Sequence, residues 1–126
     1  MRLETIIDIL DSKIKRCLIE EDQQAYLYDP YFGIVRNRVN AEYCKGLIRL
    51  DRDEDIVRKL INFLLDAQNK DGSWNEIHPY YDETSSLVTS IVGDTLLEWY
   101  KTSRDDLVRE SIESAKDYVL SCQVKP

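Results

Sequence analysis

The sequence predicts an almost entirely α-helical chain that forms one domain. Only four glycines and three prolines interrupt the 126 residues. Between them, apolar residues recur at intervals of three and four, which is helical rather than strand spacing. A hydrophobic content of 43% is sufficient for one modest core at this length. We therefore expect the all-α class, with a single domain over residues 1–126 and about five amphipathic helices.

The N-terminal third of the chain predicts two helices. The first, over residues 2–23, places a set of apolar side chains on one face: Leu3, Ile6, Ile7, Leu10, Ile14, Cys17 and Leu18. We expect this face to belong to the core. A turn-rich segment at residues 28–33 follows. The second helix is less regular and brings together Val39, Tyr43, Cys44, Leu47 and Ile48.

The remaining residues predict three further helices. The third begins near Asp53, where acidic side chains suit the unpaired N–H groups and the positive dipole end, and it stops around Asn69. The apolar stripe of the fourth consists of Leu87, Val88, Ile91, Val92, Leu96 and Trp99. The fifth opens with Ser103 and Asp106 in a spacing similar to a capping box. Its apolar side chains are Leu107, Val108, Ile112, Ala115, Val119 and Cys122.

The third and fifth helices are similar enough to indicate an internal repeat. Residues 55–58 (DIVR) match residues 106–109 (DLVR), and residues 63–68 (FLLDAQ) match residues 118–123 (YVLSCQ). The repeat units would cover about residues 25–75 and 78–126, after the N-terminal helix at 2–23. Each would contain a helix, a short acidic turn, a second helix and a loop. Chance alignment of two amphipathic helices is the alternative.

Residues 63–74, with the sequence FLLDAQNKDGSW, resemble the QW motif of squalene-hopene and oxidosqualene cyclases. The Gln-x-x-Asp-Gly-Ser-Trp form is particularly similar to class II diterpene cyclases. Residues 81–86 also resemble a Tyr-Asp-Thr-Ala stretch that follows the motif in those enzymes, although Glu83 and two serines depart from it. The resemblance implies helical hairpin repeats of the α/α-toroid type, here forming a partial ring.

The physical role expected for this motif is structural. Gln68, at the last turn of a helix, carries two amide donors and an acceptor that can engage backbone groups where helices end. Gly72 permits the reversal after the helix. Trp74 can then fold back and shield the hydrogen bonds of Gln68 with a large apolar surface.

Catalytic residues are harder to assign. Class II cyclases use an Asp-x-Asp-Asp motif whose central Asp donates a proton, and the nearest string here is DRDED at residues 51–55, in which Glu54 replaces the final Asp. Asp53 is thus a weak catalytic candidate, because the acidic run lies directly before the third helix and N-capping explains it fully. The Asp-Asp-x-x-Asp signature of class I enzymes does not occur. We expect neither a metal ion nor another cofactor.

Aromatic residues near the predicted helix ends are candidates for ligand binding. Tyr28, Tyr31, Tyr80 and Trp99 could line an apolar pocket and stabilise a carbocation through their ring faces. Ordinary packing between helices is the alternative for each of them. The only histidine, His78, lies in a probable loop beside Pro79, and we assign it no role.

Composition excludes several classes of partner. A net charge of −7 opposes binding to nucleic acid, and no apolar run is long enough to span a membrane. No signal peptide is recognised, so we expect a cytoplasmic protein. The three cysteines are odd in number and widely spaced, which disfavours a disulfide framework or a metal site. We interpret them as reduced core thiols.

Size limits the functional expectation. A closed toroid of the resembled family takes about six hairpins, whereas this chain supplies roughly two and a half. The chain could be part of a larger toroid, a short relative that closes its core differently, or a protomer of a homo-oligomer. We expect a non-catalytic or fragmentary cyclase-like repeat domain acting in protein interaction or self-association. The alternative is an isoprenoid-binding module of a terpene cyclase or prenyltransferase-like enzyme.

Overall fold

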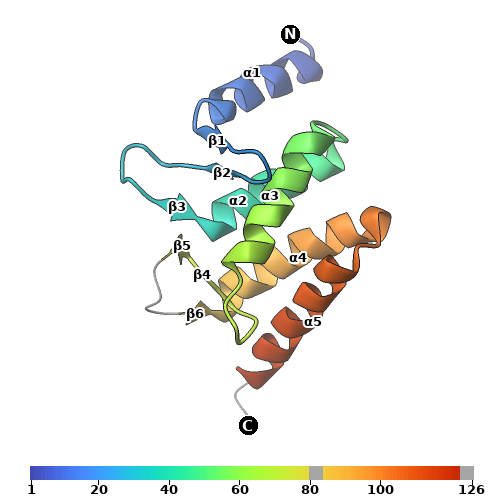
Figure 1. Cartoon of the computed structure of the whole chain (residues 1–126). Helices are drawn as coiled ribbons and strands as arrows, with labels where there is room; N and C mark the ends of the chain where they lie inside the picture. Colours follow the sequence, from blue (N-terminus) through green and yellow to red (C-terminus); the bar gives the residue numbers. More distant parts are fainter. Residues whose placement is uncertain (80–83, 123–126) are drawn as a thin grey trace.

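The computed structural model describes residues 1–79 and 84–122, most of which are helical (Figure 1). The helices are α1 (Leu3–Lys15), α2 (Asn37–Arg49), α3 (Glu54–Ala67), α4 (Ser86–Ser103) and α5 (Asp106–Ser121). The short strands are β1 (Leu18–Glu20), β2 (Ala25–Leu27), β3 (Val35–Arg36), β4 (Trp74–Asn75), β5 (Ile77–His78) and β6 (Thr84–Ser85). A mostly helical chain is confirmed. The all-α class needs one correction, because the described residues also form three two-stranded sheets.

The first helix is shorter than the sequence predicts. The expected range is 2–23, but α1 ends at Lys15 and is followed by an antiparallel hairpin of β1 and β2, in which Leu18 lies opposite Leu27. A helix continued to residue 23 would place the three acidic residues at 20–22 near the negative end of its dipole. That repulsion favours the hairpin, whose turn carries the acidic side chains to the surface.

The core lies between α2, α3 and α4. Its fully or almost fully buried apolar side chains include Ala41, Cys44, Leu47, Val57, Leu60, Ile61, Leu64, Val88, Val92 and Leu96. Leu87 and Leu107, which the sequence assigns to the core, are exposed instead. Each lies in the first turn of its helix, where no neighbouring helix covers that side.

The three cysteines differ in their environment. Cys44 is buried in α2, and burial raises the pKa of its thiol to about 12, so it stays protonated. Cys17 is half-buried, however, and Cys122 is exposed. The expectation of three core thiols is therefore wrong for Cys17 and Cys122. The cause is that α1 ends before Cys17, while Cys122 follows the last residue of α5.

The turn between α4 and α5 differs in detail from the predicted capping box. Ser103 is the last residue of α4, and Arg104 reverses the chain in a left-handed conformation with φ of 54°. Asp105 is the residue that caps α5, since its carboxylate accepts a hydrogen bond from the Leu107 N–H at 2.8 Å. The same physical need, an acceptor for the first helical N–H groups, is thus met two residues later than predicted.

The helices form two hairpins that stack on each other, α2 with α3 and α4 with α5 (Figure 1). Two ion pairs join α2 to α4: Lys45 with Asp94, and Arg49 with Glu98 at 3.2 Å. Both contacts advance by one helical turn in the same direction, so α2 and α4 run parallel. The hydroxyl of Thr95 also donates to the carbonyl of Ala41 at 2.9 Å.

The segment between the hairpins is held by two small sheets. β3 pairs antiparallel with β5, and β4 pairs antiparallel with β6. β3 and β6 lead directly into α2 and α4, respectively. Residues 74–78 therefore connect the entry points of both hairpins, which fixes the hairpins relative to each other.

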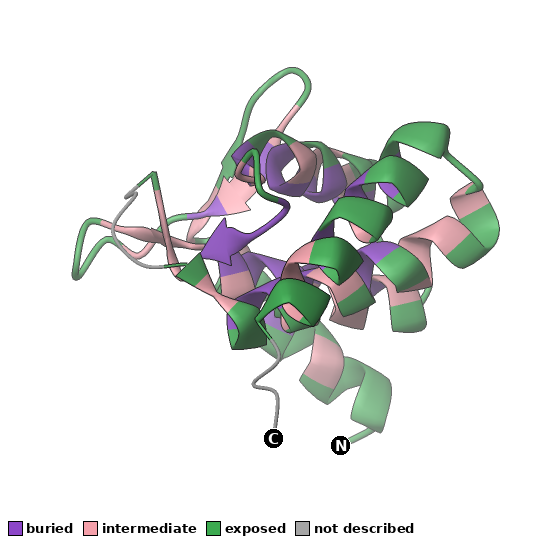
Figure 2. Ribbon diagram, turned by 90° about the horizontal axis from the view of Figure 1, so that it is seen from below, coloured by how far each residue is buried: buried purple, intermediate pink, exposed green. Residues whose placement is uncertain are grey.

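The predicted apolar face of α1 is largely uncovered. Leu3, Ile6, Leu10 and Ile14 are all exposed, with Leu10 at 55%, and Figure 2 shows the helix next to the N-terminus coloured mostly as exposed. In Figure 1, α1 projects from one end of the molecule, while α5 lies at the other. Assigning this face to the core is a wrong prediction for these four residues, because Leu10 and Ile14 border an open groove between α1 and α2 and are not packed against α2.

Polar contacts hold α1 to the rest of the protein. The Tyr43 hydroxyl donates to Asp11 at 2.6 Å, Lys15 pairs with Asp53 at 2.6 Å, and Arg52 pairs with Asp8 at 2.7 Å. Burial acts to raise the pKa of Asp11, but the hydrogen bonds from Tyr43 and Lys15 and the nearby cations outweigh it. The net effect lowers the pKa of Asp11 below its usual value of 3.8.

Replacing Tyr43 with phenylalanine is expected to lower the free energy of unfolding by about 1–2 kcal/mol at neutral pH, because the buried Asp11 carboxylate loses a donor. Since the pKa of Asp11 is lower in the folded state, its stabilising contribution is complete above 3.8 and is lost as the pH falls through the folded value. The difference between the two proteins should therefore shrink in acid.

Urea unfolding of both proteins, followed by circular dichroism from neutral pH to about pH 3, checks this expectation. Tyr26→Phe is the matched control, since the Tyr26 hydroxyl only reaches the exposed Glu21 at 3.4 Å. A Tyr43→Phe effect that does not change with pH would contradict the role given to Asp11.

Candidate functional site

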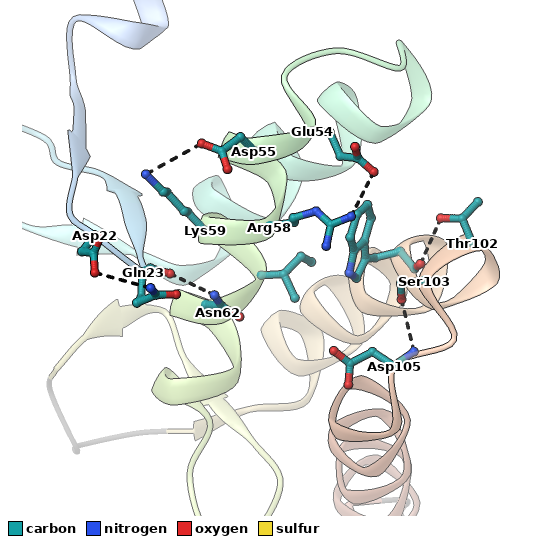
Figure 3. Close-up of a pocket in the computed structure, with 12 residues that line it drawn as sticks. Asp22, Gln23, Glu54, Asp55, Arg58, Lys59, Asn62, Thr102, Ser103 and Asp105 are labelled. Atoms are coloured by element: carbon teal, nitrogen blue, oxygen red, sulfur yellow. Dashed lines mark hydrogen bonds and ion pairs between the residues drawn. The ribbon is translucent and has the colours of Figure 1, made fainter.

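A polar groove lies between the β1–β2 turn, α3 and the end of α4 (Figure 3). Its volume is about 650 Å³, and its wall includes Gln23, Glu54, Arg58, Lys59, Asn62 and Trp99. The guanidinium of Arg58 lies 5.6 Å from the centre of the Trp99 ring, which is a cation–π distance. The face of the Trp99 ring is therefore already in contact with the guanidinium of Arg58, which belongs to α3.

Both cations in the wall of the polar groove are paired with carboxylates. Arg58 pairs with Glu54 at 3.3 Å, and Lys59 pairs with Glu20 at 2.5 Å and Asp55 at 3.8 Å. The hydrogen bond with Glu20 raises the pKa of Lys59, which moves this amine further from titration near neutral pH. General acid–base catalysis favours groups that titrate near the working pH, so Lys59 is not suited to that role.

A second groove, which we call the leading groove, separates α1 from α2. Its volume is about 480 Å³. Most of its wall is apolar, with Ile7, Leu10, Ile14, Val39, Leu47 and Leu50, while Asp11, Glu42 and Arg52 provide charges. It is a candidate for binding an apolar chain or another protein surface.

A third groove, which we call the trailing groove, lies between α4 and α5. Its volume is about 330 Å³. The wall includes Ser90, Gly93, Leu97, Ile112, Val119 and Leu120, with Asp94 and Lys116 as its charged residues. Leu97 and Leu120 are both exposed, so apolar surface is also open at this end of the stack.

The aromatic residues predicted to bind a ligand do not share one pocket. Tyr28 lines a shallow apolar hollow with Cys17, whereas Trp99 lines the polar groove. Tyr31 is 87% exposed, and its ring packs edge-on against Phe32 at 4.9 Å. Tyr80 lies outside the described residues. Among the described candidates, the structure therefore does not assemble an aromatic cage.

Asp53, the weak catalytic candidate, lies in the turn between α2 and α3. It has a left-handed conformation with φ of 50°, and its side chain does not cap α3. Its carboxylate instead pairs with Lys15 of α1 at 2.6 Å. Its observed contact is thus structural, because it attaches α1 to the first hairpin.

Gln68 joins the end of α3 to α5. Its side-chain amide donates to the carbonyls of Gly72 and Ser111, both at 3.0 Å, and its side-chain carbonyl accepts from the Ser111 hydroxyl at 2.8 Å. Both amide hydrogens and the acceptor are therefore used. The side chain of Gln68 thus links the end of α3 to α5, although Gln68 and Ser111 are 43 residues apart in the sequence.

Gly72 lies where the loop after α3 crosses α5. Its φ is +93°, and a Cβ atom at this position would lie 2.1 Å from the Ser114 carbonyl oxygen. Both the backbone conformation and the space therefore require glycine. This close approach is what allows Gln68 to reach the backbone of α5.

Trp74 is completely buried at the junction of α3 and α4. The indole N–H donates to the Leu64 carbonyl at 2.9 Å, and the backbone N–H donates to the Thr89 hydroxyl at 3.0 Å. Trp74 thus satisfies its polar atoms while filling the core between the hairpins. Gln68 bonds to Gly72 and Ser111, whereas Trp74 bonds to Leu64 and Thr89, so the shielding of Gln68 by Trp74 stays a prediction.

Replacing Gln68 with alanine is expected to lower the free energy of unfolding by about 1–3 kcal/mol, because two backbone carbonyls and a hydroxyl lose their partner. Chemical denaturation of the two proteins measures the effect. Gln23→Ala is the control, since Gln23 is exposed and contacts Asp22 at only 3.4 Å. Equal stability of Gln68→Ala and Gln23→Ala would show that the link contributes nothing.

Several important polar residues were not singled out by the sequence patterns. Asn40 is buried in α2, where its carbonyl accepts from the Leu27 N–H at 2.6 Å and its amide donates to the Arg36 carbonyl at 2.8 Å. Asn37 is buried one turn earlier and donates to the Asn75 carbonyl at 2.8 Å. In the sequence, these two residues are marked only by their three-residue spacing, which places both on the buried side of α2, and this signal is weak.

The comparisons with known proteins give no family assignment. No protein-family model matches the chain, and neither a curated protein nor a solved structure is significantly similar to it. The resemblance to terpene cyclases therefore rests on residues 63–74 and 81–86, and it stays a prediction.

The part of the chain that the structure describes offers neither a metal site nor a membrane span. Within residues 1–79 and 84–122, no group of three or more histidine, cysteine, aspartate or glutamate side chains is arranged to hold a metal ion. None of the helices in these ranges combines the length and apolar character needed to cross a membrane.

Proposed function

We propose that this chain is a helical-repeat module of the α/α-toroid type, similar in architecture to terpene cyclases and prenyltransferases, that acts through protein interaction or self-association rather than catalysis. The observation that carries the proposal is the stack of two hairpins with an apolar groove uncovered at each end. A unit of a repeat protein buries its faces against neighbouring units, so open end faces favour association.

The connections within the chain support a repeat. In each hairpin a short strand leads directly into the first helix, and a short turn with a left-handed residue leads into the second. The first helices, α2 and α4, are parallel and side by side. The hydrogen bonds of Gln68 connect the second helix of one hairpin to the second helix of the other. These features are expected for consecutive units of one repeat.

The exposed apolar side chains support association over a monomeric role. They occur at both ends of the stack, on α1 (Leu3, Ile6, Leu10) and on α4 and α5 (Leu97, Leu120). Contiguous apolar patches on soluble proteins mark interaction sites. By contrast, the weak catalytic candidate Asp53 is paired with Lys15, and the polar groove contains compensated ion pairs.

Sedimentation equilibrium of the purified chain tests the proposal. Between about 1 μM and 1 mM, the average mass should rise above that of one chain, because association follows mass action. A chain that remains a monomer over this range, and that also remains one after lowering the salt concentration, would rule out self-association.

The leading groove supports the alternative function, which is binding of an isoprenoid or other apolar chain. Its walls are mostly aliphatic, as such a ligand requires. Titration with geranylgeranyl diphosphate and with squalene, followed by the intrinsic tryptophan and tyrosine fluorescence, tests this possibility. Saturable binding of one lipid per chain that Leu10→Asp, at an exposed position in the wall of this groove, abolishes without unfolding the protein would favour the alternative.

A further inference from the structure

We propose that a second copy of this chain docks head to tail, so that the trailing groove of one copy faces the leading groove of the next. This inference rests on the proposed function and specifies which surfaces meet. The contact between the two hairpins inside one chain supplies a template for the contact between chains.

The spacing of that internal contact relates the two hairpins residue by residue. Lys45 and Arg49 of α2 contact residues of α4 that lie 49 positions later. The strand that precedes each helix and the helix start itself, Asn37 in α2 and Ser86 in α4, are also 49 positions apart, so residues 49 apart are counterparts. This relation allows each side of α4 to be compared with the corresponding side of α2.

One side of α2 is covered by α4. The residues at the counterpart positions of α4 form a side that is exposed. Ala41 is completely buried at this contact, where its carbonyl accepts from Thr95. Its counterpart on α4 is Ser90, which is exposed in the trailing groove. Ile48 is half-buried, whereas its counterpart Leu97 is 43% exposed in the same groove. The trailing groove is therefore the surface on which the next helix of the series would lie.

The opposite side of α2 shows the reverse. It is open on α2, whereas the counterpart positions of α4 are buried. Val39 and Gly46 line the leading groove, and Val39 is exposed. Their counterparts on α4 are Val88 and Thr95, which are both buried, and Thr95 contacts α2. The leading groove is therefore the surface that a preceding hairpin would cover. A head-to-tail contact that places α4 and α5 of one copy against α1 and α2 of the next covers both grooves.

Charges on the two grooves are also complementary. Glu42 lies in the leading groove and Lys116 in the trailing groove. Both are exposed, and within the described residues neither forms an ion pair in its own chain. In a head-to-tail contact, the carboxylate of one copy faces the cation of the other. A contact between two leading grooves would instead bring two Glu42 side chains together.

The helix α1 fits this arrangement as the second wall of the leading groove. Leu10 and Ile14 of α1 face the groove, and the contacts that fix α1 are the polar ones of Asp11 and Lys15. The pair α1 and α2 can thus lie against the pair α4 and α5 with the side chains of each pair entering the groove of the other. The contact is heterologous, so it can continue from copy to copy.

Two variants that each block one groove test the proposal. Leu97→Asp places a charge in the trailing groove, and Val39→Asp places one in the leading groove; both side chains are exposed, so the fold should persist. Sedimentation velocity should show that each variant alone associates at least about tenfold more weakly than the unmodified chain. An equimolar mixture should form a discrete 1:1 dimer, since each variant keeps the groove that the other lacks.

The outcomes separate this inference from the proposed function. If the unmodified chain associates but the mixture forms no 1:1 dimer, the head-to-tail contact is wrong while self-association stands. If the unmodified chain is monomeric, the head-to-tail contact and self-association both fall, and the proposed function is left with interaction with a different protein. As a second arm, Glu42→Lys should weaken association about two- to fivefold, and adding Lys116→Glu to the same chain should restore it. Failure to restore it would overturn the pairing of these two charges.

Discussion

Replacing Trp74 with alanine is expected to lower the free energy of unfolding by about 3–5 kcal/mol, the largest effect of any single aromatic substitution in this chain. Trp74 is completely buried, and its removal leaves a cavity between α3 and α4. The Leu64 carbonyl also loses its indole donor. Since small domains have a free energy of unfolding of about 5–15 kcal/mol, this variant should be close to unfolding at room temperature.

Guanidinium unfolding followed by far-ultraviolet circular dichroism measures the effect. Trp74→Phe separates its two causes, because it keeps most of the apolar volume but loses the hydrogen bond to Leu64, at an expected cost of about 1–3 kcal/mol. Phe32→Ala is the control, since Phe32 is exposed and contacts Tyr31 and Arg36. If Trp74→Ala were as stable as Phe32→Ala, the junction of the hairpins would not depend on Trp74.

Replacing Gly72 with alanine should cost about 2–4 kcal/mol through an entirely different mechanism. The added Cβ would lie 2.1 Å from the Ser114 carbonyl oxygen, and the φ of +93° is one that alanine rarely adopts. The Ser114 carbonyl oxygen and the Ser114 carbonyl carbon, which would lie 2.5 Å away, both belong to the backbone, so neither can move aside as a flexible side chain would. The loop must shift away from α5, which also breaks the hydrogen bonds of Gln68.

Gly46→Ala is the matched control for this substitution. Gly46 lies within α2, and an added Cβ would meet nothing within 4 Å. Alanine at that position should stabilise the helix by about 0.5–1 kcal/mol. The same chemical change is therefore expected to act in opposite directions at the two sites. Destabilisation of similar size at both positions would show that the close contact at Gly72 is not the cause.

The helices of the two hairpins could be predicted from the sequence because their apolar residues keep a helical period over three or more turns. Val57, Leu60, Ile61 and Leu64 in α3 illustrate this, and all four are buried. Burial of one continuous face is a strong constraint on local structure. The observed bounds of α3, Glu54–Ala67, agree closely with the expected start near Asp53 and end near Asn69.

The start of the chain could not be predicted in the same way. The apolar period of α1 continues through Cys17 and Leu18, yet the helix ends at Lys15 because the acidic run at 20–22 favours a turn. Periodicity also does not reveal whether a partner exists for an apolar face. Leu10 has the spacing of a core residue, yet it is 55% exposed. Its exposure depends on which elements pack against α1, and tertiary structure alone determines that.

The candidate site was only partly accessible to sequence reasoning. The hydrogen-bonding capacity of Gln68 could be inferred from its place at a helix end, but its partner Ser111 lies in another hairpin and has no local signal. The aromatic candidates failed to assemble for a similar reason. Tyr28 and Trp99 lie in separate grooves because the hairpin of β1 and β2 and the end of α4 occupy different parts of the molecule.

Native mass spectrometry of the purified chain, at several concentrations and with or without geranylgeranyl diphosphate and squalene, tests the central claim most directly. The account predicts complexes of two or more copies whose abundance rises with concentration and is unchanged by either lipid. A single copy at every concentration that retains one lipid per chain would contradict it and would favour an isoprenoid-binding module.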